Sequence, residues 1–183
     1  MNKALELKKI AKEIKECKIC KKGKIGKAVP GEGSPNAKIV FIGEAPGKTE
    51  AREGRPFIGR SGKYFRLVLK EIGINEKDVF ITSPVHYLPR RGTPSKEDIE
   101  HGKTYLKRQL EIINPKIIVL MGNVAVQGVL GEQIPIFKRH GGIIVRDGRK
   151  YLITFHPAYA LRFGRGKGLF KKDLEKKLTP SRN

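Results

Sequence analysis

The sequence predicts an α/β fold in which helices cover both faces of a mostly parallel sheet. Four short, nearly continuous apolar runs, at residues 38–42, 79–82, 116–121 and 151–155, are rich in β-branched side chains. Such runs are typical of strands that are buried on both faces. Apolar residues at helical spacing lie between the strands, at residues 62–72, 96–113 and 124–130. This alternation predicts a three-layer α/β/α arrangement around a central four-stranded parallel sheet.

The flanking segments complete a prediction of one domain over residues 1–183. Residues 4–17 have the spacing of an amphipathic helix that leads into a cysteine pair, and residues 23–36 are rich in Gly and Pro, as in a connection. Together they form an N-terminal segment, residues 1–36. A further hairpin is expected at residues 142–150, with its turn at Asp147-Gly148. Residues 171–183 are expected to form a charged C-terminal tail, helical at first and frayed after Pro180.

The charge of the chain points to a polyanionic partner. It has 39 Lys and Arg against 18 Asp and Glu, a net charge of +21. A field of this size favours nucleic acid, although a basic thermophile surface is an alternative explanation. The sequence has no apolar run of membrane-spanning length and no signal-peptide pattern at its N-terminus. We therefore expect a cytoplasmic protein with no membrane partner.

Polar and glycine-rich motifs follow each predicted strand. They occupy residues 43–47, 83–84, 122–123 and 156–159. Ligands of open α/β sheets bind beyond the carboxyl ends of the strands. The four motifs are therefore expected to converge on one binding site.

Three motifs, two of which lie at strand ends, resemble those of a known family. Gly43-Glu-Ala-Pro-Gly47, then residues 54–62 (GRPFIGRSG) and residues 156–162 (HPAYALR) look like the family 4 uracil-DNA glycosylases, the thermostable, iron–sulfur branch of their superfamily. The resemblance runs from about Cys17 to Arg162 with the motifs in family order. It implies the superfamily's α/β/α fold and a monomeric, monofunctional enzyme of base excision repair. Such an enzyme flips a deaminated base, uracil by default, out of DNA and excises it hydrolytically.

The resemblance also implies roles for individual residues. Glu44 would orient the attacking water and His156 would stabilise the departing base, which gains negative charge. The base would be bound by Gly43, Ala45, Phe57 and Ser83. Single- or double-stranded DNA would be contacted by Lys48, Ser61, Tyr159, Leu161, Arg162 and Arg165. Of these, Leu161 is the expected wedge that fills the gap left by the flipped base.

The chain departs from the family at the base-reading position. The family has an Asn after its second strand, and this chain has Ser83. A hydroxyl offers fewer hydrogen-bonding groups than an amide. Uracil stays the default substrate, with hypoxanthine or xanthine as alternatives.

The chain also departs at the metal site. The family binds a 4Fe–4S cluster with four cysteines, whereas this chain has only Cys17 and Cys20. Tyr87 and Gly102 match the second pair, and His86 and His101 each lie one residue away. Three interpretations stay open: zinc bound by Cys17, Cys20, His86 and His101, an iron–sulfur cluster with histidine ligation, or no metal.

Two other functions are weighed against the glycosylase. One is a non-catalytic nucleic-acid-binding protein on the same fold, for which Ser83 and the altered cysteines would be signs of lost activity. The other is an enzyme acting on free nucleotides. The second is disfavoured because the sequence has neither a Walker A motif nor a dinucleotide fingerprint after a strand.

Overall fold

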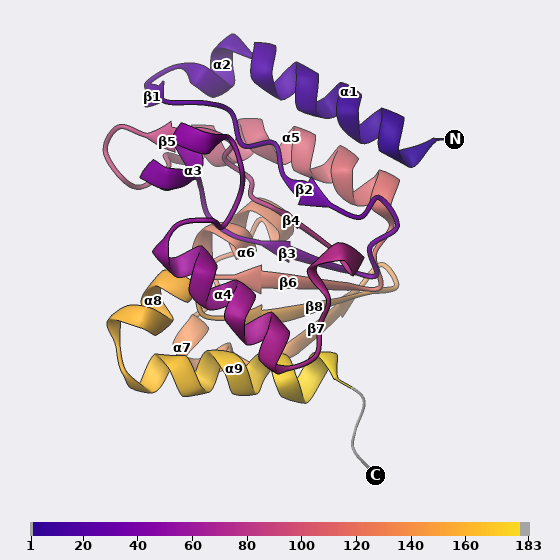
Figure 1. Cartoon of the computed structure of the whole chain (residues 1–183), viewed down its shortest axis with the longest axis vertical. Helices are drawn as coiled ribbons and strands as arrows, with labels where there is room; N and C mark the ends of the chain where they lie inside the picture. Colours follow the sequence, from indigo (N-terminus) through magenta and orange to yellow (C-terminus); the bar gives the residue numbers. More distant parts are fainter. Residues whose placement is uncertain (1, 180–183) are drawn as a thin grey trace.

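A six-stranded sheet forms the centre of the molecule (Figure 1). The structure is a computed structural model, and it describes residues 2–179. The sheet has the order β2-β4-β3-β6-β8-β7. Its strands are β2 (Glu32–Gly33), β3 (Ile39–Ile42), β4 (Val79–Thr82), β6 (Ile117–Met121), β7 (Ile143–Arg146) and β8 (Arg149–Thr154).

The four inner strands confirm the predicted parallel sheet. β3 pairs in parallel with both β4 and β6, and β6 pairs in parallel with β8. The chain thus places β4 on one side of β3 and then places β6 and β8 on the other side. The strand order therefore reverses between β3 and β6, which is where α/β sheets bind ligands.

Two antiparallel edge strands extend this sheet. β7 and β8 form the predicted hairpin, in which Asp147 and Gly148 both have positive φ, at 51° and 71°. Two successive positive φ angles match the twist of the strands that they join. β2 pairs with β4, and it lies inside the segment that the sequence indicates as a connection. A strand of two residues is too short to produce a recognisable strand pattern in the sequence.

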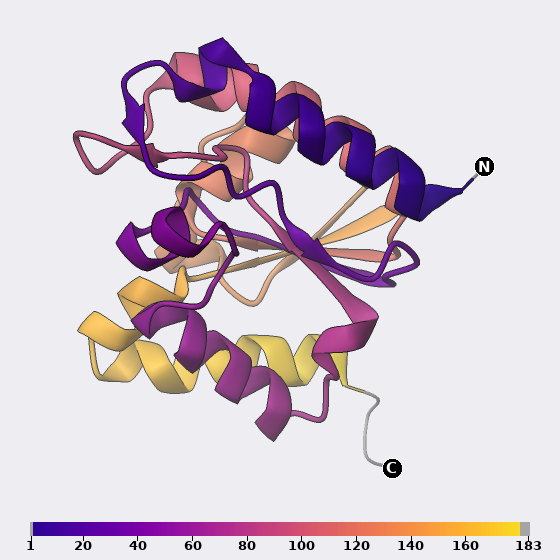
Figure 2. The ribbon, with the colours of Figure 1, turned by 45° about the horizontal axis from the view of Figure 1, so that its top comes forward.

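Helices cover both faces of the sheet (Figures 1 and 2). On one face lie α5 (Lys96–Ile113), α6 (Asn123–Leu130) and α7 (Ile136–Arg139), and on the other α4 (Arg60–Glu71), α8 (Pro157–Arg162) and α9 (Arg165–Leu178). α3 (Lys48–Glu53) and the 3₁₀ turn η1 (Glu76–Asp78) lie in the connections that flank α4.

Successive side chains along a strand point to opposite faces of the sheet, so the core is divided between the two helical layers. Val40 and Ile42 of β3 pack with Leu106 on the α5 face, while Phe41 packs with Phe65 on the α4 face. All five side chains are at most 1% exposed. A strand whose side chains are buried on both faces gives a continuous apolar run, as the sequence shows.

The N-terminal segment adds a further layer outside α5. It contains α1 (Lys3–Glu16), α2 (Lys18–Lys21) and β1 (Lys24–Ile25), and β1 pairs with β5 (Leu88–Pro89). Ile10 and Ile14 of α1 are buried in a small apolar cluster with Cys20 and Tyr87. Glu13 also forms an ion pair with Arg108 of α5.

The C-terminal segment is helical, and it also packs against the sheet. Residues 171–178 belong to α9, in which Phe170 and Leu174 are fully buried against the sheet. Many lysines lie between the apolar residues of this helix, so the sequence pattern does not show how closely the helix packs against the sheet. The expected fraying after Pro180 lies outside the described residues. Within the described residues, no helix has the length and apolar character needed to cross a membrane.

Candidate active site

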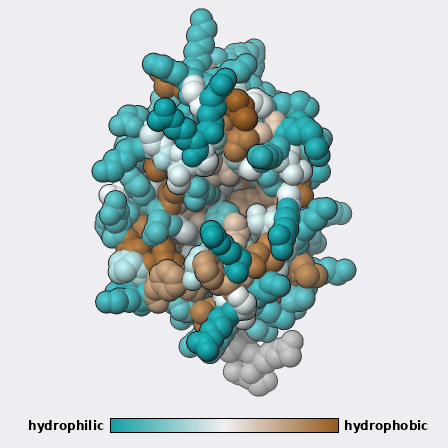
Figure 3. Space-filling model, turned by 90° about the vertical axis from the view of Figure 1, so that its left-hand side faces the viewer, coloured by the Kyte–Doolittle hydropathy of each residue, from teal (hydrophilic) through white to brown (hydrophobic). Residues whose placement is uncertain are grey.

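A pocket of about 190 Å³ opens at the carboxyl ends of the parallel strands. We call it the strand-end pocket. Most residues that line it come from the segments that follow β3, β4 and β8 and from the segment that leads into α4, and Val29 comes from the connection before β2. The lining residues are Val29, Ala45, Pro46, Gly47, Glu50, Pro56, Phe57, Ser61, Ser83, His156 and Ala158. Figure 3 faces this edge of the molecule, where pale and brown surface near the centre is surrounded by hydrophilic side chains. Three of the four strand-end motifs therefore converge here, whereas Gly122-Asn123 contributes no lining residue to this pocket and Asn123 lines a different one.

Phe57 forms an aromatic wall of the pocket and lies on strained backbone. Its φ is 52°, which is uncommon for a residue with a side chain. Its ring lies 5.2 Å from that of Phe65 and 5.8 Å from that of His156, centroid to centroid. A Cβ at Gly43 would lie 2.5 Å from the Phe57 ring. Glycine at position 43 is therefore what allows the ring to reach the end of β3.

Two charged side chains hold the Phe57 segment in place. The Glu50 carboxylate accepts hydrogen bonds from the backbone N–H groups of Ile58 and Gly59, at 2.9 and 2.7 Å. Arg66 donates to the carbonyl oxygens of Pro56 and Phe57, at 3.0 and 2.9 Å. Strain of this kind persists only where the surroundings over-determine the backbone. Neither residue could be identified from the sequence, because neither belongs to a motif whose chemistry is evident.

His156 is neutral in the pocket and has a defined tautomer. Its Nδ1 accepts a hydrogen bond from the backbone N–H of Ala158 at 3.2 Å. The ring proton therefore resides on Nε2, which lies 3.7 Å from the position of a Cβ at Gly43. Burial lowers the pKa of His156 to about 4, although the nearby Glu50 carboxylate raises it slightly. The pocket thus contains an uncharged N–H donor.

Glu44 lies between Gly43 and Ala45 but is not among the lining residues of the pocket. Its side chain is half-buried, and this burial raises the pKa of its carboxyl group. Among residues 2–179, no hydrogen bond or ion pair involves this carboxylate. It is therefore free to bind a water or a substrate group.

Ser83 lines the pocket and is buried, directly after β4. Its hydroxyl donates to the carbonyl oxygen of Val85 at 2.8 Å. With its proton engaged in this way, the Ser83 oxygen can only accept a hydrogen bond from a ligand.

A second depression of about 420 Å³ adjoins the strand-end pocket. It shares Ser61 with the pocket, and Lys48, Leu161 and Arg162 line it as well. These are four of the six residues expected to contact DNA. The other two lie elsewhere: Tyr159 packs on Phe155, with ring centroids 5.1 Å apart, and Arg165 is exposed at the start of α9.

A separate cavity of about 440 Å³, which we call the thiol cavity, lies between the N-terminal segment and α5. Cys17, Cys20 and His101 each place a potential ligand atom within 4.8 Å of the others. His86 lines the same cavity but lies outside this group. The structure therefore brings three of the four expected ligands together and places the fourth beside them.

The two thiols differ in their surroundings. Burial disfavours ionisation of Cys17, but hydrogen bonds from Tyr105, from the Cys20 N–H and from His101 outweigh it and lower the pKa to about 6. Burial and the neighbouring Cys17 raise the pKa of Cys20 to about 12. Cys17 is thus the thiol of the pair that ionises more readily.

Comparison with known proteins agrees with the geometry. A family model described as the Uracil DNA glycosylase superfamily matches residues 30–179. A protein from Sulfurisphaera tokodaii, named Type-4 uracil-DNA glycosylase, is 38% identical over 169 residues, covering 85% of this chain and 77% of its own length. One of the same name from Thermotoga maritima is 41% identical over 137 residues, covering 73% and 71%. Another, from Pyrobaculum aerophilum, is 35% identical over 156 residues, covering 80% of each chain.

Proposed function

The chain belongs to the uracil-DNA glycosylase superfamily, and we propose from this premise that it hydrolyses the bond between uracil and deoxyribose in DNA. The observation that carries the proposal is the strand-end pocket. It combines an aromatic face, an accept-only oxygen and a neutral N–H donor in one cavity. These are the groups that a flipped-out base requires for stacking and for hydrogen bonding along its edges.

Base recognition is assigned to Phe57 and Ser83. The Phe57 ring offers a flat face on which any base can stack. The Ser83 oxygen accepts from a ring N–H, which uracil has at N3 and which cytosine lacks, because its N3 carries a lone pair. Hypoxanthine also has a ring N–H where adenine has an acceptor. Ser83 therefore selects the product of deamination over the parent base, and uracil is the first substrate to test.

Bond cleavage is assigned to His156 and Glu44. As the bond between C1′ and N1 breaks, negative charge develops on the base and positive charge on the sugar. The Nε2–H of His156 donates to the uracil oxygen that gains charge, and a neutral donor does this without forming a salt bridge in the substrate complex. The Glu44 carboxylate stabilises the sugar and accepts a proton from the water that attacks C1′. The products are free uracil and an abasic site.

DNA binding is assigned to the basic rim of the adjoining depression. Lys48 and Arg162 line it, and Leu161 lies beside the pocket as a candidate wedge for the duplex. The net charge of +21 adds a sequence-independent attraction to phosphates. We expect the protein to act as a monomer and in the cytoplasm, on nucleoid DNA.

The iron–sulfur cluster implied by the family does not fit a four-thiolate site in this chain. Only two cysteines are present. Tyr87, at one of the two other cluster positions, donates from its hydroxyl to the carbonyl oxygens of Ile14 and Lys15. At the other, a Cβ on Gly102 would lie 1.6 Å from the carbonyl oxygen of Pro84. No step of the proposed reaction involves a metal.

The test is base release under single-turnover conditions from end-labelled DNA that carries one uracil, followed by alkaline cleavage of the abasic site. Parallel substrates carry hypoxanthine, xanthine or cytosine. The wild-type protein is expected to release uracil and to leave cytosine intact. Glu44→Gln is expected to lower the rate by about 10²–10⁴-fold. Glu53→Gln, an exposed carboxylate in the next helix, is the matched control and should retain the rate.

Each other outcome has a definite meaning. Release of hypoxanthine or xanthine but not uracil would support the proposed mechanism and contradict the assignment of uracil as the substrate. DNA binding by folded protein without release of any base would overturn the proposal in favour of the non-catalytic binding protein.

A further inference from the structure

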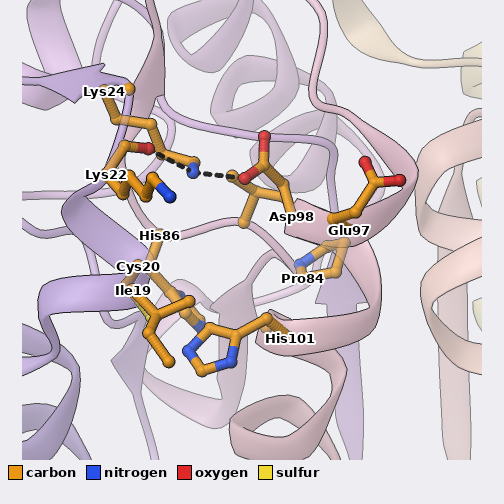
Figure 4. A pocket seen from close by; sticks show the side chains of 12 residues that line it. Ile19, Cys20, Lys22, Lys24, Pro84, His86, Glu97, Asp98 and His101 are labelled. Carbon is orange, nitrogen blue, oxygen red and sulfur yellow. Dashed lines mark hydrogen bonds and ion pairs between the residues drawn. The ribbon is translucent and has the colours of Figure 1, made fainter.

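The thiol cavity has no part in the proposed reaction, yet it is built from residues with strong ligand chemistry. Figure 4 shows Cys20, His86 and His101 directed toward the same space from three different elements. α2 supplies Cys20, the segment after β4 supplies His86, and α5 supplies His101. Ligand residues gathered from distant parts of the chain can bind one metal ion and so link those parts.

The spacing of the donor atoms suits one ion. The Sγ of Cys17 and the Nε2 of His101 are 3.2 Å apart, and the ligand atoms of Cys17, Cys20 and His101 all lie within 4.8 Å of one another. Around a tetrahedral zinc, bond lengths of 2.0–2.3 Å place neighbouring ligands about 3.5 Å apart. In a 4Fe–4S cluster each ligand binds a different iron, which separates the ligands further.

His86 supplies an independent observation. The side chain is buried, with 2% of the residue exposed, and its Nδ1 lies 3.2 Å from the carbonyl oxygen of Val29. Its Nε2 is buried and has no hydrogen-bond partner among the described residues. A buried polar atom without a partner is costly. Donation from Nδ1 to a carbonyl is also how a metal-binding histidine is held with the Nε2 lone pair free.

We propose that Cys17, Cys20 and His101 bind a single zinc ion and that the Nε2 of His86 is its fourth ligand. Zinc is favoured because it accepts mixed sulfur and nitrogen ligands in a closed tetrahedral site. Two thiolates neutralise its charge. Four protein ligands leave no open position for a substrate, so the ion is structural.

The ion would fasten the N-terminal segment to the rest of the protein. Of the four ligands, two precede the first strand of the main sheet, and two lie in the segments that follow β4. In the structure, β1 and β5 have only two residues each, so the strand pairing next to the cavity is short. Removal of the metal should therefore loosen this layer before the sheet unfolds.

The experiment measures metal content, independently of glycosylase activity. The full chain is produced with both iron and zinc supplied, purified without oxygen, and analysed for zinc, iron and acid-labile sulfide. One zinc per chain is expected. Replacement by Co²⁺ should give the intense visible bands of a tetrahedral site and a thiolate-to-cobalt charge-transfer band. A chelator should lower the Tm of the wild-type protein.

Variants identify the ligands. Cys17→Ser, Cys20→Ser and His101→Ala are each expected to weaken Co²⁺ affinity by at least about 100-fold, and His86→Ala by about 10–100-fold. His140→Ala is the matched control, because His140 pairs with Asp173 in a different part of the fold. It should bind cobalt like the wild type. Circular dichroism of each apoprotein separates loss of a ligand from loss of the fold.

Three results would overturn the proposal. Folded wild-type protein with no bound metal would exclude the site. Iron with stoichiometric sulfide would replace zinc by a histidine-ligated cluster. Unchanged cobalt affinity and spectrum in His86→Ala would remove His86 as a ligand.

Discussion

The strand-end pocket and the thiol cavity lie on opposite sides of the segment that follows β4, and they are held together in different ways. The walls of the pocket leave the ends of hydrogen-bonded parallel strands, and Phe57 is fixed by Glu50 and Arg66. The cavity is closed by the part of the N-terminal segment that contains α2 and β1, and within residues 2–179 β1 pairs only with the two-residue strand β5. The pocket is therefore preorganised by the fold, whereas the cavity depends on what its side chains bind.

The largest expected effect separates the two regions by function. His156→Ala should lower the single-turnover rate of uracil release by about 10²–10³-fold, because it removes the donor to the departing base. The metal content of the same preparation should stay at the wild-type value. A simultaneous loss of metal would show that the two regions are not independent.

The next test challenges the thiol cavity with the family's own residue. Gly102→Cys restores a cysteine position, but its Cβ would lie 1.6 Å from the Pro84 carbonyl oxygen. Backbone must move, so we expect a loss of roughly 3 kcal/mol in the free energy of unfolding, measured with denaturant. We also expect no gain of iron or sulfide. A stable variant that acquires a cluster would contradict this account of the cavity.

A smaller effect concerns acid stability. Folding lowers the pKa of His156 from 6.5 to about 4. Between these values the unfolded chain binds a proton that the folded chain excludes, so stability falls as the pH falls through this range. His156→Asn should reduce the pH dependence of the unfolding free energy between pH 7 and pH 4 by at most roughly 3 kcal/mol. Denaturant titrations of both proteins at several pH values measure it.

The smallest expected effect lies at the rim of the pocket. Arg162→Gln removes one candidate phosphate contact and should reduce the slope of log K against log salt by about one. Lys167→Gln, on the exposed side of α9, is a suitable control for net charge. Fluorescence anisotropy with undamaged DNA at several salt concentrations provides the measurement. Equal slopes for the two variants would show that Arg162 makes no specific contact with a DNA phosphate.

The sequence predicts the sheet well because buried parallel strands leave an unambiguous signal. The runs at 38–42 and 116–121 coincide with β3 and β6 to within a residue. Because Ser83 and His156 each follow a predicted parallel strand, their proximity could also be predicted from the sequence. The role of Glu50 could not be predicted, since a carboxylate that caps backbone N–H groups looks like any surface Glu until the loop is folded. The same holds for His86, since the lack of a partner for its Nε2 among residues 2–179 can be seen only once its neighbours are placed.

The segment from Ser83 to His86 should tolerate few substitutions, because it borders both regions. Its first residue presents an oxygen to the strand-end pocket, and its last residue lines the thiol cavity. Between them, the carbonyl of Val85 holds the Ser83 hydroxyl, and Pro84 is packed closely against Gly102 and Gly128. In a library of single variants selected separately for uracil release and for heat resistance, substitutions in this segment should fail in both selections. Substitutions at most other positions of the two regions should fail in only one.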